Sequence, residues 1–94
     1  MSLERDVDRG RMADEVLQNH VYAESYEQVE KEIHRAWAAA RNKDDREQLH
    51  QLLQMLTKVR GVLETTMRSG KIAAEELQRR KSLARRVGER LAGF

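Results

Sequence analysis

The chain lacks cysteine and proline altogether and has little glycine or aromatic side chain. Its 94 residues include five glycines and four aromatic residues. Without cysteine the protein can form neither a disulfide nor a thiolate metal site. Without proline nothing in the composition forces long helices to end, and the charged fraction of 36% is typical of such helices. We therefore expect an all-α protein whose core consists of Leu, Val, Ile and Ala.

Long apolar runs are also missing. No segment approaches the roughly 18 residues that a transmembrane helix needs, and the start of the chain lacks the apolar region of a secretory signal. These absences predict a soluble intracellular protein without a membrane partner. The net charge of +2 is unevenly spread, because residues 1–70 hold eleven Lys/Arg and thirteen Asp/Glu, whereas residues 71–94 hold seven and three.

The periodicity of apolar residues divides the chain into segments. Residues 1–13 are charged and aperiodic, so we expect a disordered leader, either native or added to the natural protein. Residues 14–94 form one helical domain, with helices expected at about 20–41, 45–69 and 71–90. Gly70 is predicted to end the second helix as a C-cap, and Asp44 with Glu47 resembles a capping box at its start.

The short polar turn near Lys43 forces the first two of these helices into an antiparallel hairpin. Facing residues should then have numbers that sum to about 86. This register predicts that Trp37 is substantially buried near Leu49 and His50. It also places Tyr26 beside Arg60 and Gly61, where the glycine either leaves room for the tyrosine ring or is an exposed, tolerated residue.

The third predicted helix is strongly basic and is the main functional candidate. Its cations suit either an acidic protein surface, such as the glutamate-rich face of the first helix, or nucleic-acid phosphate. It has no aromatic residue for base stacking before Phe94, and we favour the protein partner. The interaction candidates are Arg79, Arg80, Lys81, Arg85, Arg86 and Arg90.

Residue sets that carry chemistry are lacking. Glu47 and His50 have the spacing of a di-iron helix pair, but a second pair and two further inward carboxylates are missing. The serines and threonines have no His/Asp partners at motif spacing, and Gly70-Lys71 lacks the rest of a phosphate loop. We therefore expect no catalytic residue, no metal site and no cofactor, and no enzymatic activity.

Several short segments together resemble a group of small helical proteins encoded by tailed bacteriophages and prophages. They are Ala36-Trp37, Asp44-Asp45-Arg46-Glu47, the leucine-rich run to Val59, and Ser69 to Ala73, within residues 20–75. Proteins of this group are mostly uncharacterised. The resemblance implies a location in the cytoplasm of a bacterial host cell or in a virion, and carries over no functional residue.

The sequence thus predicts a long antiparallel hairpin with a third basic helix that either packs back or projects. Two apolar stripes of this length are poorly covered within one hairpin, so we expect a homo-oligomer, most simply a dimer. The leading functional hypothesis is a non-catalytic, coiled-coil-like assembly or interaction protein. The alternative is a small nucleic-acid-binding protein that uses the basic C-terminal helix.

Overall fold

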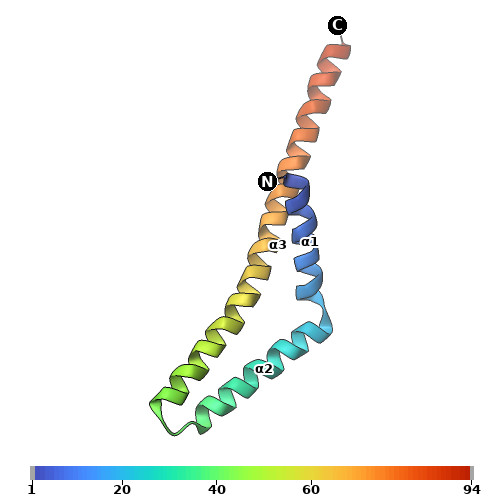
Figure 1. Cartoon of the computed structure of the whole chain (residues 1–94). Helices are drawn as coiled ribbons and strands as arrows, with labels where there is room; N and C mark the ends of the chain where they lie inside the picture. The colour runs from blue at the N-terminus through green and yellow to red at the C-terminus, as the bar shows by residue number, and fades with distance from the viewer. Residues whose placement is uncertain (1, 94) are drawn as a thin grey trace.

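The computed structural model describes residues 2–93 and confirms the all-α class. It contains α1 (Leu3–Gln18), α2 (His20–Ala39) and α3 (Lys43–Ala92). In Figure 1, α1 and α2 follow one another down one side of the molecule, and α3 returns antiparallel along the other. The molecule is elongated, with principal extents of 80 × 25 × 15 Å.

The expectation of a disordered leader at residues 1–13 is wrong, except that residue 1 lies outside the described residues. Residues from Leu3 onward form α1, capped by Ser2, whose Oγ accepts a hydrogen bond of 3.2 Å from the backbone N–H of Arg5. Glu4 and Asp6 lie in the first turn, where carboxylates complement the helix dipole. The inward positions of α1 are spaced by three and four residues, but small residues occupy the central ones, Gly10 and Ala13.

The predicted break at Gly70 is also absent, because α3 runs without interruption for 50 residues. Gly70 is buried in the middle of α3 and faces Gly10 of α1. A Cβ built on Gly10 would lie 2.6 Å from the Cα of Gly70, and a Cβ built on Gly70 would lie equally close to the Cα of Gly10. The two glycines thus allow the backbones of α1 and α3 to touch. The predicted helices 45–69 and 71–90 are a single helix, and Gly70 serves as a contact point inside it and not as its end.

Two asparagines set the ends of the other helices. Asn19 ends α1 and caps α2, because its Oδ1 accepts a 2.9 Å hydrogen bond from the backbone N–H of Tyr22. Asn42 caps α3 in the same way, accepting 2.8 Å from the N–H of Asp45. The capping box predicted at Asp44 is therefore wrong: the cap lies two residues earlier, at an equally good capping residue.

The predicted hairpin register is supported by contacts between α2 and α3. The Arg60 guanidinium carbon lies 5.0 Å from the centre of the Tyr26 ring, and Trp37 shares a shallow groove with Leu49. Trp37 is nevertheless 47% exposed, so its predicted burial is wrong. One hairpin covers only one side of the indole, while Arg46 lies 5.4 Å from the ring centre.

Gly61 does not make room for Tyr26. Nothing lies within 4 Å of a Cβ built on Gly61, so the glycine is a tolerated one, although it is half-buried and not exposed as that alternative had it. Arg60, not an empty space, covers the tyrosine ring at this level. A cation above an aromatic face is attracted by the ring quadrupole, which holds this part of the hairpin together.

Little apolar side chain is enclosed by the single chain. Among the described residues, Ala13 and Ala73 are the only buried hydrophobic ones, and both lie beside the glycine contact. The leucines that face α2, including Leu49, Leu53, Leu56 and Leu63, are half-buried. The backbones of α1 and α3 therefore touch near Gly10 and Gly70, whereas the apolar side chains between α2 and α3 remain partly exposed.

Candidate interaction surface

A second apolar stripe runs along α3, on a side that neither α1 nor α2 covers. It consists of four large residues spaced by three, four and three positions, and we call it the α3 stripe. Each of them is more than half exposed: Leu52 56%, Met55 60%, Val59 57% and Val62 59%. Spacing of this kind places side chains on one helix face, as in the seam of a helical bundle.

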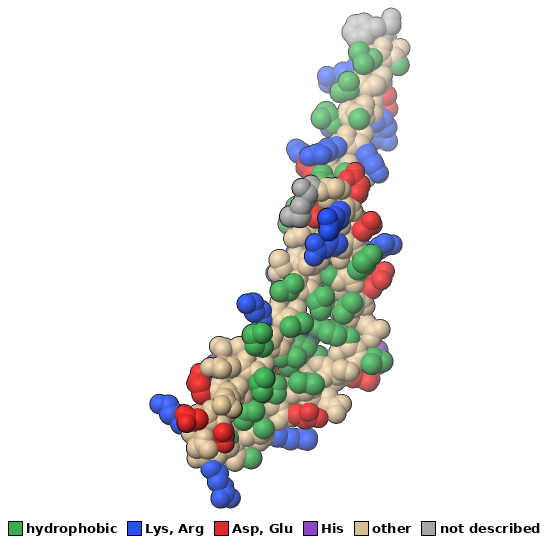
Figure 2. Space-filling view, viewed as in Figure 1, with side chains coloured by type: hydrophobic (Ala, Val, Ile, Leu, Met, Phe, Trp, Pro, Cys, Tyr) green, Lys and Arg blue, Asp and Glu red, His purple; other side chains and the backbone are tan. Residues whose placement is uncertain are grey.

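The α3 stripe continues onto α2 through a shallow apolar groove. Ala36 and Ala39 of α2 and the capping residue Ala40 line this groove together with Leu49 and Leu52 of α3. Figure 2 shows hydrophobic side chains gathered over the angle between the two helices, in the lower half of the molecule. Because small alanines line one wall, a further helix can approach this face closely.

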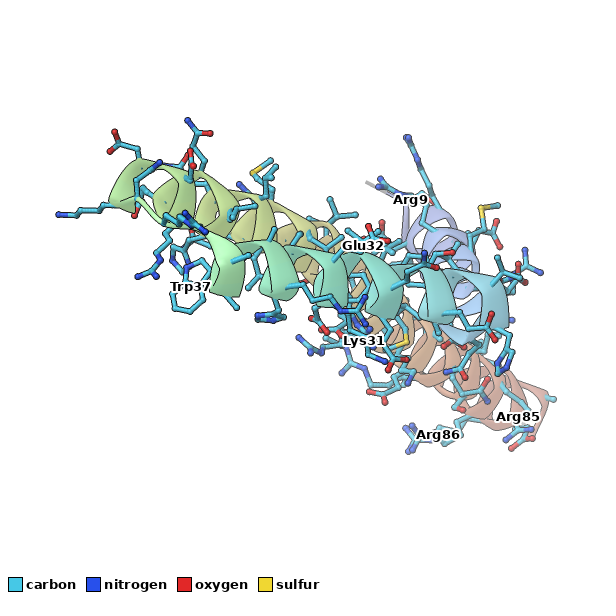
Figure 3. All side chains as sticks on the ribbon, turned by 90° about the horizontal axis from the view of Figure 1, so that it is seen from below. Arg9, Lys31, Glu32, Trp37, Arg85 and Arg86 are labelled. Carbon is cyan, nitrogen blue, oxygen red and sulfur yellow. The ribbon has the colours of Figure 1, made fainter. Side chains whose placement is uncertain are left out.

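The opposite side of the hairpin carries a smaller groove next to Trp37. Ile33, Trp37, Leu49 and Leu53 supply apolar walls, and His34 and His50 stand at the rim. Figure 3 shows Trp37 pointing away from the side on which Arg9 projects. His50 thus borders an apolar groove, and no group of three His, Asp or Glu able to hold a metal ion occurs within residues 2–93.

The six predicted cations lie on the C-terminal part of α3, most of which projects beyond the start of α1 (Figure 1). Glu76 accepts hydrogen bonds of 2.8 Å from Arg79 and 3.0 Å from Arg80. The hydrogen bonds from Arg79, and then from Arg80, lower the pKa of the Glu76 carboxyl. Within the described part of the chain, the other cations form no ion pair; they are Lys81, Arg85, Arg86 and Arg90.

These cations do not form one continuous basic face. Their positions advance around the helix, so that only some of them can meet a given partner at once. Figure 3 places Arg85 and Arg86 on the side away from Arg9. Arg80 and Arg90, by contrast, follow Val59 and Val62 of the α3 stripe by multiples of seven residues. The structure therefore combines charge and apolar surface on one projecting helix.

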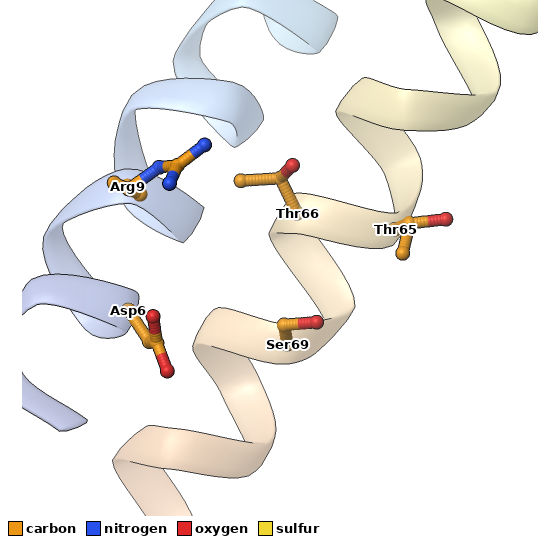
Figure 4. Close-up of a pocket in the computed structure, with 5 residues that line it drawn as sticks. All are labelled: Asp6, Arg9, Thr65, Thr66 and Ser69. Carbon is orange, nitrogen blue, oxygen red and sulfur yellow. The ribbon is translucent and has the colours of Figure 1, made fainter. Parts of the chain in front are cut away.

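A polar depression lies where α1 crosses α3. Asp6 and Arg9 of α1 line it opposite Thr65, Thr66 and Ser69 of α3 (Figure 4). The hydroxyl of Thr66 already donates to the carbonyl of Val62 at 2.8 Å. None of these hydroxyls has a histidine beside it to act as a base, so the depression offers no arrangement for nucleophilic catalysis.

Sequence reasoning missed the contribution of the α3 stripe and of α1 to this surface. The periodicity of the sequence shows that these residues are apolar without showing which neighbour covers them. The signal available in the sequence is a second set of apolar residues beside the inward leucines, at the same spacing of three and four residues.

A comparison of the chain with known protein families, with curated proteins and with solved structures finds no match. Among the described residues no helix is long and apolar enough to cross a membrane. The function therefore has to be argued from the chain itself.

Proposed function

We propose that this chain is a non-catalytic assembly protein that works as a self-associated helical bundle. The observation that carries the proposal is the surface area of the single chain. It exposes 7927 Å², whereas a compact monomer of 11.0 kDa is expected to expose about 5,600 Å². The difference exceeds the roughly 800 Å² per partner that a standard protein interface buries.

The arrangement of the α3 stripe supports this proposal. In a four-helix bundle each helix packs against two neighbours, on faces roughly a quarter turn apart. On α3 one such face carries the half-buried leucines that meet α2, and the adjacent face carries Leu52, Met55, Val59 and Val62. A second copy of the chain can supply a helix that is long and apolar enough to cover that adjacent face.

Light scattering and sedimentation of matched variants test the proposal. Val59→Glu places a charge in the α3 stripe, and Met12→Glu places one at an equally exposed apolar residue of α1, 56% exposed and outside the stripe. We expect the wild type and Met12→Glu to form the same oligomer at micromolar concentration, and Val59→Glu to be a helical monomer. A folded wild-type monomer at high micromolar concentration, or an unchanged oligomer in Val59→Glu, would overturn the proposal.

The second candidate, nucleic-acid binding, rests on the six cations of the projecting part of α3. If they bound duplex phosphate, each contact would contribute a slope of about −0.9 in log affinity against log salt. With only some of the six engaged, the slope would be roughly −3 to −5. Submicromolar, salt-sensitive duplex binding that Arg85→Gln/Arg86→Gln weakens would favour this candidate over the protein partner.

A place in a tailed-bacteriophage or prophage setting, inside the host cell or in the virion, belongs to the same proposal. It rests on the resemblance of residues 20–75 to the small helical proteins of such phages. Partner proteins encoded near the gene would be the first to test for co-purification with the full chain.

A further inference from the structure

The C-terminal arm of α3, residues 79–92, is a helix that has no packing neighbour among the described residues from Leu83 onward. Most of it projects beyond α1, and every residue from Leu83 to Gly93 is exposed. A helix segment of this length is marginal in water unless one face packs against another element. Three large apolar residues lie exposed on the arm: Leu83, Val87 and Leu91.

The arm and the α3 stripe occupy equivalent positions of a seven-residue repeat. Leu83 follows Met55 and Val62 by multiples of seven residues, and Val87 follows Leu52 and Val59 likewise. In the gentle left-handed supercoil of helical bundles, residues seven apart stay on the same face. One uncovered apolar face therefore extends along α3 at two levels, separated by the stretch against which α1 packs.

We infer that two copies of this chain pair antiparallel through this face, so that the arm of each copy packs on the α3 stripe of the other. This inference rests on the proposed self-association and gives it a geometry. The stripe is centred near residue 57 and the arm near residue 87. The two-fold axis then crosses α3 near residue 72, and both apolar levels are covered at once.

The distribution of charge selects the antiparallel arrangement over the parallel one. Residues 79–92 hold six cations and one acid, Glu89, for a net charge of +5. A parallel pair would align two such arms side by side, where like charges repel. The antiparallel pair instead lays each arm alongside the partner's α2, whose four glutamates, one lysine and one arginine give a net charge of −2.

The antiparallel arrangement also fits the open angle between α2 and α3. The partner's arm would approach the groove lined by Ala36, Ala39 and Leu52, which a third helix can enter closely because its α2 wall is built of alanines. Each end of the dimer would then be a three-helix bundle of α2, α3 and the partner's arm. In a parallel pair, the partner's arm would not reach the groove between α2 and α3.

Because the wild type has no cysteine, single cysteines with spin labels can measure the arrangement in the full chain. Glu75 and Glu89 are exposed glutamates 14 residues apart, at equivalent positions of the seven-residue pattern. In the antiparallel dimer the two labels at Glu89→Cys are separated by about 50 Å along the axis, and those at Glu75→Cys by only about 9 Å. In a parallel dimer both variants give the same short separation.

We expect distance measurements by pulsed electron resonance to show a separation near 50 Å for Glu89→Cys and a much shorter one for Glu75→Cys. Equal short distances would overturn the antiparallel inference while leaving self-association intact. Long distances in both variants would overturn the register. A monomer by light scattering, with no inter-label distance, would overturn the proposed function too, and a distance seen only with added duplex DNA would assign the arm to nucleic acid.

Discussion

Gly10 and Gly70 meet backbone to backbone, with no side chain between α1 and α3 at that level. A Cβ on Gly70 would also lie 3.0 Å from the carbonyl oxygen of Asp6, and one on Gly10 would lie 3.1 Å from that of Thr66. The obstructing atoms belong to helical backbone and cannot rotate away. Both positions therefore require glycine if α1 is to stay docked.

Gly70→Ala should accordingly weaken the docking of α1 by about 1–3 kcal/mol, the usual effect of overpacking. Gly61→Ala is the matched control, because it lies in the same helix with open space around it. It should raise the free energy of unfolding by about 1 kcal/mol through helix propensity. Hydrogen exchange of the α1 amides and urea unfolding measure the two effects, and equal protection of α1 in both variants would contradict the first.

Tyr22→Phe should stabilise the protein by up to about 1 kcal/mol. The Tyr22 hydroxyl is buried and has no hydrogen-bond partner among the described residues, so it loses its water without compensation. The ring itself lies 6.2 Å from that of Tyr26, centre to centre, and this contact is kept in phenylalanine. Thermal unfolding at fixed protein concentration tests this, and a clear loss of stability would reveal a partner for the hydroxyl.

The Glu76 carboxyl should titrate below its ordinary pKa of 4.5, because Arg79 and Arg80 donate hydrogen bonds to its charged form. A lowered folded-state pKa means that these bonds stabilise the fold above the ordinary pKa. This contribution is lost as the pH falls through the lowered pKa. Carbon-detected NMR titration gives the midpoint, and replacing both arginines by glutamine should move it back up.

The hairpin register could be predicted from sequence because large residues at fixed spacing define it. Tyr26 meets Arg60 and Trp37 stands near Leu49, as the position of the turn requires. The exposure of Trp37 could not be predicted in the same way, since pairing of faces does not say how many neighbours cover a ring. Whether a second chain covers it stays a prediction.

The errors at residues 1–13 and at Gly70 have one physical cause. Patterns of hydropathy detect helices through large apolar side chains, but α1 and α3 meet through Gly10, Ala13, Gly70 and Ala73. Glycine at a predicted helix end and glycine at a close helix crossing look alike in one sequence. The repeated Gly-x-x-Ala in both segments was the only local sign that they belong together.

The near absence of buried apolar side chain has a thermodynamic consequence. Heat capacity rises on unfolding in proportion to the apolar surface that becomes hydrated. A single chain that exposes 7927 Å², against about 16,000 Å² for an unfolded chain of 11.0 kDa, hydrates less new surface on melting than a compact domain of that mass. In the proposed oligomer, part of the heat-capacity change on melting should therefore come from dissociation of the chains, and the melting temperature should climb with concentration.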